Sequence, residues 1–124
     1  IASITLVVPD YDAAIAFYVD RLGFTLLEDT ELSPSKRWVR VAPPGAETAL
    51  LLAKADGANQ TAAIGNQTGG RVGFFLHTDD FTRDHTAMLT KGVTFREAPR
   101  HEPYGTVAVF EDPFGNLWDL IEPK

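Results

Sequence analysis

Few residues of this sequence could carry acid–base chemistry. The chain has three histidines, His77, His85 and His101, and no cysteine. His77 ends an apolar stretch, where its imidazole could serve as a hydrogen-bonding group or a general base. His85 falls on the apolar face of an expected helix, which predicts a packed histidine. His101 lies in a polar stretch that we expect to be a solvated loop.

The adjacent acidic residues of this sequence can be explained without a catalytic role. Asp79 and Asp80 are adjacent carboxylates, but Asp80 stands where a helix should begin. Helix capping and the helix dipole account for both without catalysis. If the chain is an enzyme, the catalytic candidates are His77, Asp119 and Glu111. No Ser/His/Asp arrangement or phosphate-binding loop is recognisable.

Composition excludes several classes of function. The 124 residues carry a formal net charge of -6, which disfavours nucleic acid and anionic membranes as partners. The absence of cysteine excludes disulfides and thiolate metal sites. No apolar run reaches transmembrane length and no signal peptide is visible, so we expect a cytoplasmic protein.

The elements that must position these residues fall into two similar halves. In the first half, Asp10 is expected to cap a helix that Gly23 ends. In the second half, Asp80 is likewise expected to cap a helix that Gly92 ends. The apolar patterns around them predict strands at 4–8, 24–28, 37–42, 48–53, 72–78, 93–97, 106–110 and 117–122. Each half therefore reads βαβββ.

The domain organisation follows from this repeat. We predict a single domain, 1–124, made of two modules at about 1–53 and 71–124. The polar, glycine-rich stretch at about 54–70 is predicted to be a linker, with a cleft-covering loop as the alternative.

Two motifs connect the sequence to a known family. The first motif consists of Val8-Pro-Asp10, Phe17-Tyr18 and Leu22-Gly23-Phe24. The second motif spans 110–122 and contains an Asp-Pro-Phe-Gly-Asn turn. With these residues the chain resembles the vicinal oxygen chelate superfamily of glyoxalase I, bleomycin-resistance proteins and extradiol dioxygenases. The resemblance implies an α+β fold in which the curved mixed sheets of two βαβββ modules surround a cleft. It also implies a homodimer.

The same resemblance implies four positions for metal ligands. They fall on Ser3, Leu51, Gly73 and Asp119, and only Asp119 has a suitable side chain. We therefore expect no cofactor. A divalent metal held by a different set of residues is the alternative.

Strand alternation indicates which side chains should face the cleft. If Val39 and Val41 pack against a helix, then Trp38 and Arg40 face away from it. The same argument, applied to Val107 and Val109, places Thr106, Ala108 and Phe110 in the cleft. The expected ligand-binding residues are Trp38, Arg40, Phe75, His77, Thr106, Phe110 and Asp119. For Trp38 and Arg40, a dimer surface is the alternative.

Two functions remain open from the sequence. The first is a protein of the bleomycin-resistance kind that binds a small aromatic or cationic molecule without a metal. The second is a metal-dependent lyase, isomerase or dioxygenase of the same superfamily with a non-standard metal site.

Overall fold

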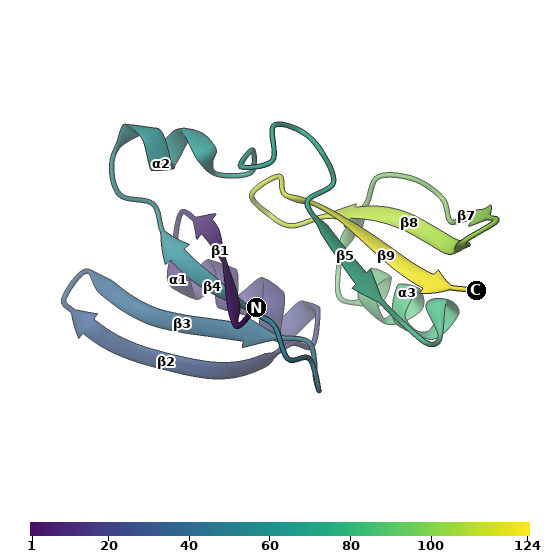
Figure 1. Cartoon of the computed structure of the whole chain (residues 1–124), viewed down its shortest axis with the longest axis horizontal. Coiled ribbons are helices and arrows are strands. Elements are labelled where there is room, and N and C mark those ends of the chain that lie inside the picture. The colour runs from purple at the N-terminus through teal and green to yellow at the C-terminus, as the bar shows by residue number, and fades with distance from the viewer. The chain divides into compact units, whose positions relative to one another are not determined.

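The computed structural model describes all residues from 1 to 124. The chain forms two compact units, Ile1–Gly65 and Asn66–Lys124, called the N-terminal and C-terminal units below. Each unit has one sheet with a helix across one of its faces (Figure 1). The predicted α+β class is confirmed. None of the helices has the length and apolar composition of a membrane-spanning segment.

The N-terminal unit contains the first βαβββ series. Its strands are β1 (Ser3–Val8), β2 (Thr25–Ser33), β3 (Lys36–Ala42) and β4 (Ala49–Lys54), and its helices are α1 (Tyr11–Ile15), η1 (Ala16–Arg21) and α2 (Ala58–Ala63). The sheet order is β1-β4-β3-β2. β1 runs parallel to β4, whereas β3 is antiparallel to both of its neighbours. Helix α2 lies inside the stretch predicted to be a linker and was not expected.

The first helix begins and ends as its sequence indicates. The carboxylate of Asp10 accepts a hydrogen bond of 2.8 Å from the backbone N–H of Ala13, which confirms the predicted cap. The helix then widens into a π-helical turn, in which the N–H of Leu22 donates to the carbonyl of Phe17 at 3.0 Å. Gly23 follows with φ of 78°, a conformation that favours glycine.

The sheet of the N-terminal unit buries one face against this helix. Val39 pairs with Leu52, Val41 pairs with Leu50, and all four side chains are buried. Because neighbours along a strand point to opposite faces, Trp38 and Arg40 lie on the face away from α1. The predicted orientation of these strands is confirmed. We call this second surface the open face.

The C-terminal unit repeats the plan with one addition. Its elements are β5 (Phe74–His77), α3 (Phe81–Thr90), β6 (Thr94–Phe95), β7 (Arg100–Glu102), β8 (Gly105–Glu111) and β9 (Leu117–Pro123). The sheet order is β5-β9-β8-β6, and β7 also pairs with β8. The short strand β7 contains His101, so the prediction that this residue lies in a loop was wrong.

An aromatic layer fills the space between the C-terminal sheet and α3. The ring of Trp118 stacks on Phe74 at 4.6 Å and on Phe110 at 5.8 Å. His85, from α3, contacts Phe95 with a centroid distance of 4.5 Å, so the prediction of a packed histidine is confirmed. These contacts identify the α3-covered face of the sheet.

This layer corrects the prediction for strand β8. Phe110 pairs with Trp118 and is fully buried, and Thr106 pairs with Glu122 on the same face. Both residues were expected on the opposite face with Asp119. Alternation along β8 was read correctly, but both of its faces are apolar, so the pattern alone could not decide which face meets the helix.

The β8–β9 turn orients the last strand. The carboxylate of Asp112 accepts hydrogen bonds from the N–H groups of Phe114 and Asn116, at 3.0 and 2.8 Å. Its other oxygen accepts one from the side-chain amide of Asn116 at 2.7 Å. The predicted turn is thereby confirmed, and it fixes the register that places Asp119 beside Val109.

Candidate functional site

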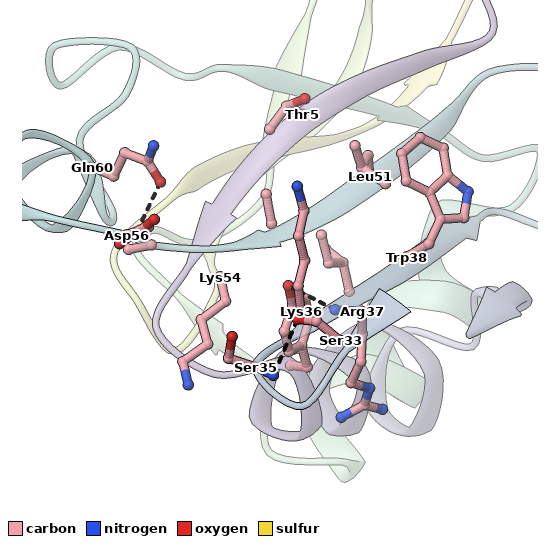
Figure 2. A pocket seen from close by; sticks show the side chains of 14 residues that line it. Thr5, Ser33, Ser35, Lys36, Arg37, Trp38, Leu51, Lys54, Asp56 and Gln60 are labelled. Atoms are coloured by element: carbon pink, nitrogen blue, oxygen red, sulfur yellow. Dashed lines mark hydrogen bonds between the residues drawn. The ribbon is translucent and has the colours of Figure 1, made fainter. Parts of the chain in front are cut away.

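The N-terminal unit contains a groove on the open face of its sheet (Figure 2). Its volume is about 640 Å³, within the range of small-molecule sites. Side chains of β1, β3 and β4 form its floor, and the segment leading into α2 closes one end. The lining residues used below are Thr5, Lys36, Trp38, Leu51, Lys54, Asp56 and Gln60.

Trp38 is the largest exposed aromatic surface in this groove. Its side chain is 40% exposed although it lies in the middle of a sheet strand. Leu51 lies on the same face of the neighbouring strand, where it pairs with Arg40. An indole ring beside an aliphatic side chain provides a flat apolar surface on which a planar ring can stack.

Lys36 brings a positive charge to the same surface. It precedes Trp38 by two residues, so both side chains leave β3 on the open face. Figure 2 shows the Lys36 side chain extending along the sheet toward Thr5 and Leu51, whereas the Lys54 ammonium group points away from Trp38. No carboxylate of the unit forms an ion pair with Lys36.

Arg40 lies on the open face as predicted, but two of its three side-chain nitrogens already have partners. One terminal nitrogen lies 2.7 Å from the carboxylate of Glu28. Its Nε donates to the hydroxyl of Ser3 at 3.1 Å. Because two strands of its own sheet hold the guanidinium group, the charge of Arg40 is fixed on the open face, and Arg40 is not one of the residues that line the groove.

Arg37 supports the groove from the helix-covered face. Its guanidinium group contacts Asp29 at 2.7 Å and Asp12 at 2.8 Å. The hydrogen bonds from Arg37 hold the pKa of Asp29 below its ordinary value. The backbone N–H of Arg37 also donates to the hydroxyl of Tyr11 at 3.2 Å. Together these contacts attach the β2–β3 hairpin to α1.

The far end of the groove is formed by residues that the sequence interpretation missed. The side-chain oxygen of Gln60, in α2, accepts a hydrogen bond of 2.8 Å from the backbone N–H of Asp56. Both residues belong to the stretch predicted to be a linker. Lys36 was also missed, because the strand was predicted to begin at residue 37, whereas β3 begins at Lys36.

In the C-terminal unit, Phe75, His77 and Asp119 lie on the sheet face away from α3. Phe75 pairs with Asp119 in the parallel register of β5 and β9, and His77 pairs with Ile121. The Phe75 side chain is 64% exposed. The prediction that these three residues share a face is confirmed.

Asp119 has an unusual electrostatic environment. Its Oδ1 atom is buried and accepts no hydrogen bond. Burial raises the pKa of the Asp119 carboxyl group, the positive charge of Arg100 opposes this shift, and the negative charge of Glu97 adds to it. The Glu97 carboxylate is itself held by Arg100 at 2.9 Å and by the N–H of Val109 at 3.2 Å.

The three catalytic candidates do not form one constellation. Glu111 pairs with Leu117 and lies 3.1 Å from Arg96, whereas His77 lies beside Ile121. Along β9 these two positions are four residues apart, about 13 Å in an extended strand. One reacting atom could not contact both side chains.

Thr106 belongs to a separate, smaller hollow on the α3-covered side. This hollow has a volume of about 280 Å³ and is lined by Phe81, Thr82, His85, Pro99, His101, Thr106 and Glu122. Glu122 accepts a hydrogen bond of 2.7 Å from the N–H of Phe81, and the hydroxyl of Thr106 lies 3.3 Å from Nδ1 of His101. Its polar groups therefore contact one another.

Comparison with known proteins places this fold in a family. The model of the Glyoxalase/Bleomycin resistance protein/Dioxygenase superfamily matches residues 1–120. The chain belongs to this superfamily. A protein of Shewanella frigidimarina (strain NCIMB 400) is 55% identical, with 98% of this chain and 92% of that protein covered. The superfamily named from the two sequence motifs is therefore confirmed.

Solved structures of other proteins share this fold over nearly the whole chain. UcmS2 is 30% identical with a TM-score of 0.84, covering 98% of this chain and 96% of that one. TnmS3, described as an antibiotic binding protein from Streptomyces sp. CB03234, is 33% identical with a TM-score of 0.80. That match covers 100% of this chain and 95% of TnmS3.

The superfamily's metal-ligand positions do not fit a metal in this chain. The hydroxyl of Ser3 accepts a hydrogen bond from Nε of Arg40, so a positive charge already lies beside this position. A side chain at Gly73 would bring its Cβ within 2.7 Å of the Thr68 methyl group. Leu51 has no donor atom. No group of three or more His, Asp or Glu side chains is placed to hold an ion.

Proposed function

We propose that this superfamily member binds a small aromatic molecule in the groove of its N-terminal unit, without a metal ion. The observation that carries the proposal is the exposed indole of Trp38 on the floor of a groove of about 640 Å³. Burying an aromatic side chain against a planar ligand is a strong source of binding free energy.

Two further observations support binding rather than catalysis. TnmS3, which is 33% identical over the whole length of this chain, is described as an antibiotic binding protein. Within this chain, the carboxylates and imidazoles that could do acid–base chemistry are dispersed, and Glu111 is paired with Arg96. These features favour retention of a ligand over its conversion.

The face of the C-terminal sheet that carries Phe75 and Asp119 is a second candidate contact surface. Phe75 offers an exposed ring, and the buried oxygen of Asp119 lacks a hydrogen-bond donor. A ligand that stacked on Phe75 and donated to Asp119 would satisfy both groups.

Nuclear magnetic resonance can test the proposal through the two tryptophans. The indole N–H signals of Trp38 and Trp118 are assigned with the variant Trp38→Phe. We would then titrate the protein with three naphthalene probes of similar shape, 2-naphthoate, 2-naphthylmethanol and 2-naphthylmethylammonium. At least one probe should shift the Trp38 signal and leave the Trp118 signal in place, because Trp118 is only 4% exposed.

Absence of any shift in the Trp38 signal would contradict the proposal. If none of the three probes shifts the Trp38 signal at concentrations up to about 5 mM, even millimolar stacking is absent and the groove is not an aromatic site.

A further inference from the structure

The open face of β3 presents a cation, an aromatic ring and a second cation in a row. Lys36, Trp38 and Arg40 leave the strand on the same side, about 7 Å apart along the chain. The charge of Arg40 is compensated by Glu28 at 2.7 Å. The charge of Lys36 has no such partner within its unit.

Other charges around the groove do not offset that of Lys36. Arg37 lies on the opposite face, where Asp12 and Asp29 neutralise it. The carboxylate of Asp56 lies at the α2 end, away from Trp38 in Figure 2, and it forms no ion pair with a lysine. Lys54 also lacks an ion pair, but its ammonium group points away from Trp38 in Figure 2. Lys36 is therefore the uncompensated cation on the same face as the exposed indole.

We propose that the ligand of the groove is an aromatic anion. Its ring would stack on Trp38, and its acidic group, such as a carboxylate or sulfonate, would pair with the ammonium group of Lys36. This inference rests on the proposed function and specifies the charge of the ligand. It differs from the expectation of a cationic ligand, which came from Asp119 and the net charge of the chain.

The geometry of Lys36 suits this role. A lysine ammonium group on a flexible stem can follow an acidic group over several ångströms, and it needs no fixed planar arrangement. Because the ion pair would be partly exposed to water, we expect it to select among ligands rather than to dominate affinity.

Isothermal titration calorimetry with the same three probes tests the inference. We expect 2-naphthoate to bind about fivefold more tightly than the neutral 2-naphthylmethanol, and the cationic probe to bind most weakly. Lys36→Gln should remove the preference for 2-naphthoate, and Lys36→Arg should keep it. Arg21→Gln, which removes one positive charge from the exposed end of η1, is the matched control and should leave the preference unchanged.

The calorimetry distinguishes the charge preference of the groove from the existence of the aromatic site. The inference is supported if Lys36→Gln loses the preference for 2-naphthoate while its affinity for the neutral probe stays the same as in the parent protein. Equal affinity for the three probes, or preference for the cation, would overturn it while the proposed aromatic site stands. Failure of all three probes to bind would instead overturn the proposed function itself.

Discussion

Arg40 reaches past strand β4 and donates a hydrogen bond from its Nε to the hydroxyl of Ser3 on β1, at 3.1 Å. The same guanidinium group contacts Glu28 on β2. One side chain thus connects both edges of the four-stranded sheet on its open face. It also places a fixed positive charge beside Ser3, the first of the four metal-ligand positions that the resemblance implies.

The first prediction concerns this connection. Arg40→Gln should lower the free energy of unfolding by about 1 kcal/mol, because a partly exposed pair with two hydrogen bonds is lost. Urea denaturation of Arg40→Gln, Glu28→Gln and the double variant measures the coupling between the two residues. We expect a coupling of about 0.5 kcal/mol or more, and strictly additive effects would show that the pair does not stabilise the sheet.

The second prediction concerns Asp119 and pH. The pKa of this carboxyl group is raised in the folded chain, chiefly by burial. Its stabilising contribution is therefore fully present below its ordinary pKa of 3.8 and is lost as the pH rises through the folded value. Asp119→Asn should increase the unfolding free energy at pH 7 by about 1 kcal/mol, with a smaller gain near pH 4.

Chemical denaturation at a series of pH values checks this sign. Glu47→Gln, at an exposed carboxylate without an ion pair, is the control for removal of one negative charge. If Asp119→Asn were less stable than the parent at pH 7, the ionised carboxylate would have to be favourable in the folded state. The interpretation of its environment would then be wrong.

The third prediction concerns the β8–β9 turn. Asp112 is 3% exposed and accepts three hydrogen bonds from Phe114 and Asn116. Asp112→Ala should therefore destabilise the chain by about 2–3 kcal/mol, since several buried donors lose their acceptor. Thermal unfolding measures the effect. Asp79→Ala, which loses only an exposed ion pair with Arg83, should change stability by less than about 0.5 kcal/mol.

The fourth prediction concerns metal ions. Protein purified after addition of nickel, zinc or iron should contain far less than one ion per chain by elemental analysis, because Ser3, Leu51 and Gly73 supply no suitable donors. Treatment with a chelator should leave the affinity for 2-naphthoate unchanged. Stoichiometric metal that survives dialysis would contradict the metal-independent site.

The sequence predicted the architecture because its local signals agree with one another. Asp10 and Asp80 cap their helices, and Gly23 and Gly92 follow the helix ends with positive φ. These are short-range effects of capping and backbone geometry, which a single chain displays directly. Alternation also placed Trp38 and Asp119 on the correct faces.

The errors arose where long-range packing decides between equivalent patterns. Strand β8 is apolar on both faces, so only its pairing with Trp118 shows that Phe110 belongs to the core. Helix α2 has no large apolar residue, no buried residue and no capping side chain, so its sequence resembles a loop. The role of Lys36 depends on which arginines already have carboxylate partners, and only the tertiary structure shows those pairs.

The most direct test of the central claim is the dissociation constant of 2-naphthoate for the parent protein and for Trp38→Ala, measured by calorimetry. Trp38 is 40% exposed, so its replacement should leave the fold intact. We predict that binding weakens at least about tenfold, because the stacking surface is lost. Equal affinity in the two proteins would contradict the claim that this groove is the binding site.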